Sequence, residues 1–273
     1  MGGKIVKVPL KDFTYNLPEM SKKITNKTKL IFICNPNNPT GTIVTEQEVA
    51  DFMSKVPEHC IVVFDEAYAE FAGSKDYPES MKYIKEGKNV LITRTFSKLY
   101  GLAGLRIGYG IGPKNLINTL RKVIEPFPAN RLAQAGACAA LDDHEFAKKV
   151  LETNEEGKQY FYQEFSKLGM ACCPSYTNYV FVDLGMDVQF VFKKLLEQGI
   201  IIRPGNIWGL PQHARITMGT MDQNKKLIEA FRGIPVANID DCMGRTAALD
   251  AGIRPINHTP LLGVAFTVMA PAG

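Results

Sequence analysis

The 273-residue sequence lacks a hydrophobic run long enough to cross a membrane, and its amino terminus has no apolar core. The first residues instead carry Lys4, Lys7, Lys11 and Asp12, so we expect neither a signal peptide nor a membrane anchor. Charge of one sign is also scarce, because the net charge is +4 and no basic run or basic–aromatic alternation occurs. The charge pattern therefore does not indicate nucleic-acid binding.

Spacings typical of metal ligands are missing as well. The six cysteines form no C-x-x-C pair, and the four histidines are scattered. The cysteines are Cys34, Cys60, Cys138, Cys172, Cys173 and Cys242. We interpret them as reduced thiols of a cytoplasmic protein and expect no metal site.

The length allows one large domain or two modest ones.

What is present is an alternation of short apolar runs and amphipathic stretches. Strand-like runs lie near residues 4–8, 29–33, 60–64, 90–94 and 105–111, and helical ones near 45–55, 79–85 and 113–124. This order predicts an α/β fold with a mostly parallel sheet covered on both faces. Thr45 followed by Glu48 predicts a capping box at the start of the helix near 45–55.

The second half of the sequence reads differently. Helical patterns cover 129–141 and 144–168, and the latter is long enough to lead into a second domain. Strands near 178–183, 200–203 and 213–218 and helices near 187–198 and 221–231 then predict a small α+β domain.

One lysine stands among residues that suit a reactive amine. Lys98 follows Thr95 and Ser97 and precedes Arg106, so hydroxyls and a guanidinium flank it. An amine can form a Schiff base with a carbonyl cofactor and can then move a proton as general base and acid. Hydroxyls and a bidentate guanidinium are suited to a phosphate group.

Two further segments follow strand-like runs. Asp65 ends the apolar run 60–64, at the strand end where open α/β sheets place ligands, and Tyr68 lies three residues on. Asn38 belongs to a turn rich in Asn, Pro and Gly after the run 29–33. Asp65 offers a carboxylate for a cationic ring nitrogen, while Asn38 and Tyr68 offer hydrogen-bond donors. The alternatives are a helix cap for Asp65 and a plain loop for Asn38.

The order and spacing of these segments resemble fold-type I transaminases, and most closely the histidinol-phosphate aminotransferase family. The resemblance covers residues 2–231 and implies pyridoxal 5'-phosphate as cofactor, with Lys98 as the catalytic lysine. It implies cofactor contacts from Asn38, Asp65, Tyr68, Thr95, Ser97, Lys98 and Arg106. It also implies that Arg215, assisted by Arg203, binds the anionic end of the substrate. The expected partners are an amino donor, a 2-oxo acid and, as in the family, a second copy of the chain.

Both ends of the sequence depart from that family pattern. The start resembles an interior segment of the family, so we expect an amino-terminally truncated chain with an incomplete large domain. Residues 234–273 resemble the start of the family of 4-hydroxy-4-methyl-2-oxoglutarate aldolase and the regulator of ribonuclease activity, which suggests a short foreign tail. The expected domains are 1–142 for the cofactor, 143–232 as the small domain, and 233–273 as this fragment.

Three functions stay open from the sequence. The first is transamination between histidinol phosphate and 2-oxoglutarate in histidine biosynthesis. The second is a related reaction, by another transaminase or a threonine-phosphate decarboxylase, because these relatives share the same site residues. The third is an inactive truncated or fused fragment.

Overall fold

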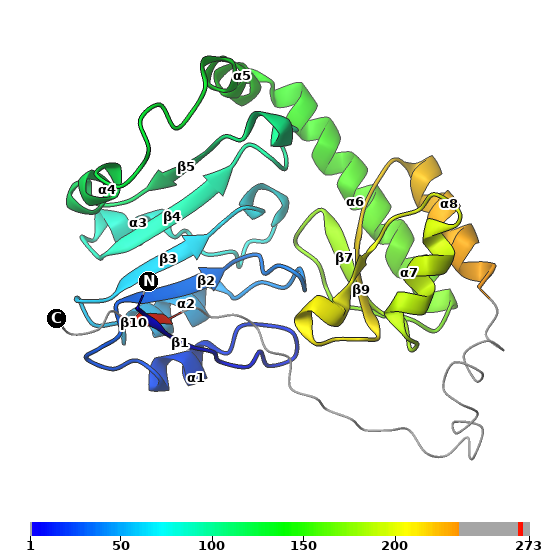
Figure 1. Ribbon diagram of the computed structural model, residues 1–273, viewed down its shortest axis with the longest axis horizontal. Coiled ribbons are helices and arrows are strands. Elements are labelled where there is room, and N and C mark those ends of the chain that lie inside the picture. Colours follow the sequence, from blue (N-terminus) through cyan, green and yellow to red (C-terminus); the bar gives the residue numbers. More distant parts are fainter. Residues whose placement is uncertain (1, 235–266, 270–273) are drawn as a thin grey trace. The chain divides into compact units, whose positions relative to one another are not determined.

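The computed structural model describes residues 2–234 and 267–269, and its chain forms two compact units. Within the described residues, unit 1 comprises 2–152, 174–178 and 267–269, and unit 2 comprises 153–173 and 179–234. The boundary falls inside one helix, α6 (His144–Lys167), which Figure 1 draws as a single uninterrupted rod. Each unit has its own sheet and its own buried side chains.

Unit 1 is built on a six-stranded sheet with the order β1-β10-β2-β3-β4-β5 (Figure 1). Its strands are β1 (Lys4–Val6), β2 (Leu30–Cys34), β3 (Ile61–Asp65), β4 (Val90–Thr95), β5 (Gly108–Ile111) and β10 (Thr267–Met269). The sheet centre is apolar because β2, β3 and β4 carry fully buried side chains, such as Ile33, Phe64 and Ile92. The predicted α/β fold is thereby confirmed.

The sheet is mixed rather than mostly parallel. β2, β3 and β4 run parallel, whereas β5 is antiparallel to β4. The physical reason is the connection between them, residues 96–107, which holds only a 3-10 turn at Ala103–Leu105. A parallel strand needs a crossover connection, usually a helix, to return to the other end of the sheet. β10, from the tail, pairs antiparallel with both β1 and β2.

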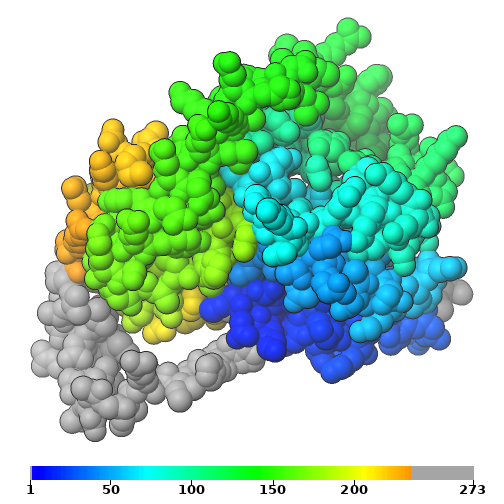
Figure 2. Space-filling view, turned by 180° about the vertical axis from the view of Figure 1, so that it is seen from behind, coloured from blue at the N-terminus to red at the C-terminus, as the bar shows by residue number. Residues whose placement is uncertain are grey.

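Apart from α1, which was not predicted, the helices of unit 1 follow the sequence pattern. They are α1 (Leu17–Lys22), α2 (Glu46–Met53), α3 (Met81–Lys85), α4 (Lys114–Arg121), α5 (Arg131–Asp142) and the first part of α6. The capping box at Thr45 and Glu48 is confirmed, with each residue bonding the other's backbone. Around α4 and α5, apolar side chains such as Val123, Phe127 and Leu132 are exposed. Figure 2 shows this part of the chain, in green, at the molecular surface.

Unit 2 is a four-stranded antiparallel sheet, in the order β6-β7-β9-β8, packed on helices. Its elements are β6 (Ala171–Cys172), β7 (Tyr179–Asp183), α7 (Val188–Leu196), β8 (Arg203–Pro204), β9 (His213–Thr217) and α8 (Met221–Arg232). Val180 and Val182 of β7 join Phe161 and Phe165 of α6 in one apolar cluster, which also includes Ile228 of α8. The tail resemblance predicted for 234–273 lies almost wholly outside the described residues.

Candidate active site

The carboxyl ends of the three parallel strands in unit 1 lie at the same edge of the sheet. In the strand register, Cys34 of β2 stands beside Asp65 of β3, and Asp65 stands beside Thr93 of β4. The turn that carries Asn38 therefore leaves the sheet next to Asp65, as does the segment after Thr95 that carries Lys98. This edge is where open α/β sheets place their ligands.

Lys98 and Tyr68 meet at this edge. The Lys98 Nζ lies 5.3 Å from the centroid of the Tyr68 ring. Tyr68 is buried, at 4% exposure, so its ring has a fixed position beside the Lys98 side chain. The lysine segment is itself held by backbone bonds, because the Phe96 N–H donates to the Ile107 carbonyl at 3.2 Å.

Asp65 is the last residue of β3, and its carboxylate accepts a hydrogen bond from the Ala67 N–H at 3.2 Å. Asp65 is exposed at the end of β3, but partial desolvation of its carboxylate raises its pKa, and the Ala67 bond offsets only part of that shift. A carboxylate in this state gains from a cationic partner, because opposite charges favour each other's charged form.

A layer of buried polar side chains supports the turn that carries Asn38. The Asn37 side chain donates to the Thr40 hydroxyl at 2.7 Å, and the Thr40 and Thr42 hydroxyls are 2.9 Å apart. The Asn35 side chain bonds both the N–H and the carbonyl of Val44. Asn38 itself is exposed, so the turn presents it on a rigid base.

The three residues predicted to hold a phosphate are placed differently from one another. The Thr95 hydroxyl accepts from the Ser97 N–H at 3.0 Å, which folds the hydroxyl segment onto itself. Arg106 is exposed and donates from Nη1 to the Ala103 carbonyl at 2.8 Å. The prediction that the strand-like run 105–111 includes Arg106 is wrong, since the φ of Arg106 is +56° and β5 begins at Gly108. A left-handed residue ends the 3-10 turn and cannot join the ladder.

The two predicted substrate arginines lie in unit 2, on neighbouring strands. Arg203 of β8 and Arg215 of β9 are direct cross-strand partners. Arg203 is exposed, whereas Arg215 is half-buried against the rings of Tyr179 and Trp208. The other predicted residues thus all belong to unit 1, whereas these two are paired in unit 2.

The sequence interpretation missed an ion pair next to the site. Glu66 is 1% exposed, and its Oε2 accepts from Arg94 Nε at 3.0 Å and from Arg94 Nη2 at 2.7 Å. The pair links the residue after Asp65 to the residue before Thr95. A signal existed, because opposite charges at the ends of two adjacent apolar strands are candidates for a cross-strand pair.

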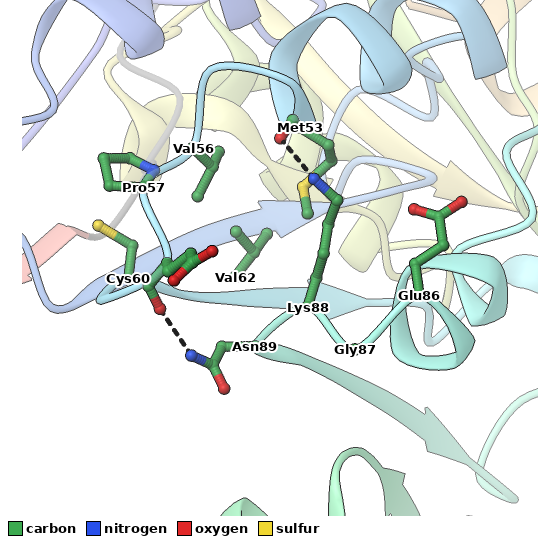
Figure 3. A pocket seen from close by; sticks show the side chains of 10 residues that line it. Met53, Val56, Pro57, Cys60, Val62, Glu86, Gly87, Lys88 and Asn89 are labelled. Atoms are coloured by element: carbon green, nitrogen blue, oxygen red, sulfur yellow. Dashed lines mark hydrogen bonds between the residues drawn. The ribbon is translucent and has the colours of Figure 1, made fainter.

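A cavity of about 400 Å³ opens at the opposite, amino-terminal ends of β3 and β4 (Figure 3). Cys60 and Val62 line it together with Lys88 and Asn89, which bond the Met53 and Glu58 carbonyls. None of the predicted site residues lines this cavity. Within the described ranges, no cluster of three or more metal-binding side chains occurs, and no helix is both long and apolar enough to cross a membrane.

Comparison with known proteins gives a consistent result. A family model described as aminotransferase class I and II matches residues 1–231. The histidinol-phosphate aminotransferase of Moorella thermoacetica is 46% identical over 235 residues, which are 86% of this chain and 61% of that protein. The corresponding protein of Brevibacillus brevis is 48% identical over 233 residues, 85% of this chain and 64% of that protein.

Solved structures agree with these sequence matches. Histidinol-phosphate aminotransferase from Sinorhizobium meliloti in complex with pyridoxal-5'-phosphate superposes with a TM-score of 0.79 at 31% identity, covering 86% of this chain and 66% of that one. The enzyme of the same name from Clostridium acetobutylicum has a TM-score of 0.77 at 23% identity, over 84% of this chain and 70% of that one, and shows the fold alone. The chain spans less than two thirds of the length of the curated relatives described above.

Proposed function

Because the chain belongs to the class I and II aminotransferase family, we propose that it moves an amino group between histidinol phosphate and 2-oxoglutarate. The observation that carries this proposal is the placement of the Lys98 amine against the Tyr68 ring, at the sheet edge where Asp65 ends β3. Residues 1–142 would hold the cofactor, and residues 143–232 would bind the anionic end of the substrate.

The residues at this edge fit the pyridoxal phosphate that the family uses. The donor set combines an amine, two hydroxyls and a guanidinium with a carboxylate whose raised pKa a cationic ring nitrogen would lower. When bound, the cofactor withdraws electrons from the substrate carbon that carries the amine. The Asp65 carboxylate would accept a hydrogen bond from the N–H of the cofactor ring. Lys98 would hold the cofactor and move the proton at the substrate Cα.

The remaining contacts follow from position in the fold. Asn38 and Tyr68 would donate to the ring oxygen from the turns after β2 and β3. Thr95, Ser97 and Arg106 would hold the phosphate. The Ser97 N–H and the Thr95 hydroxyl already lie on one short turn, which suits several bonds to one phosphate group.

Substrate recognition would fall to the paired arginines of unit 2. Arg203 and Arg215 place two cations on adjacent strands, and like charges in that position repel each other. An anion bound between them removes the repulsion, and a phosphate monoester offers more negative charge than a carboxylate.

A homodimer and a cytoplasmic location are also parts of the proposal.

The test uses the full chain supplied with pyridoxal phosphate. Borohydride reduction followed by peptide mapping should place the label on Lys98, and Lys98→Arg should remove both the label and glutamate formation from histidinol phosphate and 2-oxoglutarate. The control Lys122→Arg changes an exposed lysine and should leave both unchanged. A label on another lysine would refute the proposal, and carbon dioxide release from threonine phosphate would indicate the decarboxylase instead.

A further inference from the structure

One face of the unit 2 sheet carries aromatic and cationic side chains together. Side chains alternate between the two faces of a strand, and the even-numbered residues of β7 and β9, such as Val180 and Ile216, lie in the apolar cluster. The odd-numbered residues Tyr179, Phe181 and Arg215 therefore share the other face. Phe181 and Arg215 are direct cross-strand partners on it.

Two rings flank the Arg215 guanidinium. Its central carbon lies 4.9 Å from the centroid of the Tyr179 ring and 5.8 Å from that of the Trp208 ring. Both distances are within the range of a cation–π interaction. Rings hold a cation without adding negative charge, so the guanidinium keeps its attraction for an incoming anion. Tyr179 is 1% exposed and cannot move away, whereas Trp208 is half-buried at the edge of the face.

The position of Trp208 is fixed by the short 3-10 helix that carries it, Gly205–Trp208. A Cβ added at Gly205 would lie 2.5 Å from the carbonyl oxygens of both Leu210 and His213, so only glycine allows this turn to pack so closely on the start of β9. The Trp208 ring also meets the Phe181 ring edge-on, with centroids 6.1 Å apart. The close packing of the turn and the contact with the Phe181 ring thus fix the position of the Trp208 ring.

We propose that Trp208 is a positioning residue for the substrate anion. With Tyr179 it holds the Arg215 guanidinium in one orientation, beside Arg203, so that the two arginines together bind a phosphate monoester. Because Arg203 and Arg215 repel each other, an unclamped Arg215 side chain would turn away from its neighbour. This inference rests on the proposed function, since it concerns the subsite that recognises the same substrate.

The experiment measures phosphate binding at the two arginines of the full chain, without the cofactor. Phenylglyoxal modifies arginine side chains, and peptide mass spectrometry follows Arg203 and Arg215 individually while inorganic phosphate is titrated at constant ionic strength. Trp208→Leu should raise the phosphate concentration that halves modification by about three- to tenfold, as loss of one cation–π contact implies. Trp208→Phe keeps a ring and should stay within about twofold of the unchanged chain.

Two comparisons make the result decisive. Ile207→Ala alters an exposed neighbour on the same turn, at 64% exposure, and should leave protection unchanged. In the unchanged chain, Trp208 is the one tryptophan, so its fluorescence should change saturably with phosphate, and Arg215→Gln should abolish that change. Unaltered protection in Trp208→Leu, or fluorescence indifferent to phosphate, overturns the inference. Protection that depends on Trp208 supports it even where Lys98 takes up no cofactor, which would refute only the proposed function.

Discussion

Replacing Glu66 by glutamine should destabilise unit 1 by about 2–3 kcal/mol. The carboxylate is buried and accepts two bonds through one oxygen from the Arg94 guanidinium, whose side chain is 31% exposed. Removing one partner of a fully buried pair costs about 3–5 kcal/mol, because the other charge is left uncompensated. Partial exposure of Arg94 lets water recover some of that loss, so the expected value lies below that range.

The measurement is urea unfolding followed by two signals. Far-UV circular dichroism reports both units, whereas the fluorescence of Trp208 reports unit 2. We expect Glu66→Gln to lower the dichroism midpoint and to leave the fluorescence midpoint much closer to that of the unchanged chain. Glu79→Gln is the matched control, because Glu79 pairs with Lys85 at 3.7 Å on the surface with both side chains about 70% exposed. Such a pair contributes at most about 1 kcal/mol. Equal effects of the two substitutions would show that the buried pair does not support this edge of the sheet.

Three further results are expected. Asp65→Asn should slightly raise the urea midpoint of the cofactor-free chain and should weaken cofactor binding. Partial desolvation of the exposed Asp65 carboxylate raises its pKa, so its charged form opposes folding at pH values above the pKa of the unfolded state; a lower midpoint would contradict this. Gly41→Ala should lower the free energy of unfolding, measured with urea, by about 2 kcal/mol. Gly41 has a φ of +80°, and an added Cβ would lie 2.6 Å from the Ser175 hydroxyl oxygen. A change below about 0.5 kcal/mol would contradict this prediction. Burial lowers the pKa of His213 despite the nearby Asp183, so the folded state binds the proton less readily and stability should fall as the pH drops below about 6.5. His213→Gln should flatten that fall in the fluorescence midpoint, and an unchanged slope would exclude His213 as its source.

The sequence predicted most elements whose pattern is set by local residues. The runs that became β2, β3 and β4 are apolar and rich in β-branched residues, and that pattern is visible without the structure. Burial alternates along β2 and β4, so one face of these strands is only partly buried rather than covered as expected. The capping box before α2 was equally visible, since it needs only two residues at a fixed spacing.

The misses share a different cause, which is dependence on distant partners. The apolar residues 200–202 were expected in a strand, yet β8 contains only Arg203 and Pro204, and Ile201 is 77% exposed. The direction of β5 depends on the length of its connection rather than on its own residues. Likewise, the candidate site residues were predicted from their neighbours in sequence, whereas the contacts of Arg94 with Glu66 and of Trp208 with Arg215 join residues of different elements.

The antiparallel pairing of β5 with β4 also determines the closure entropy of the loop that carries Lys98. Thr95 and Gly108 are direct ladder partners, so residues 96–107 form a loop whose two ends are already held together. Lengthening such a loop adds little to its closure entropy, since even a doubling costs only about 0.6 kcal/mol. Closure entropy therefore does not oppose a change in the reach of Lys98. What opposes an insertion near Gly101 is the loss of bonds inside the loop, such as that from the Leu102 N–H to the Phe96 carbonyl at 2.9 Å. Tolerance of the fold to a change in this loop and tolerance of catalysis to the same change are separate quantities.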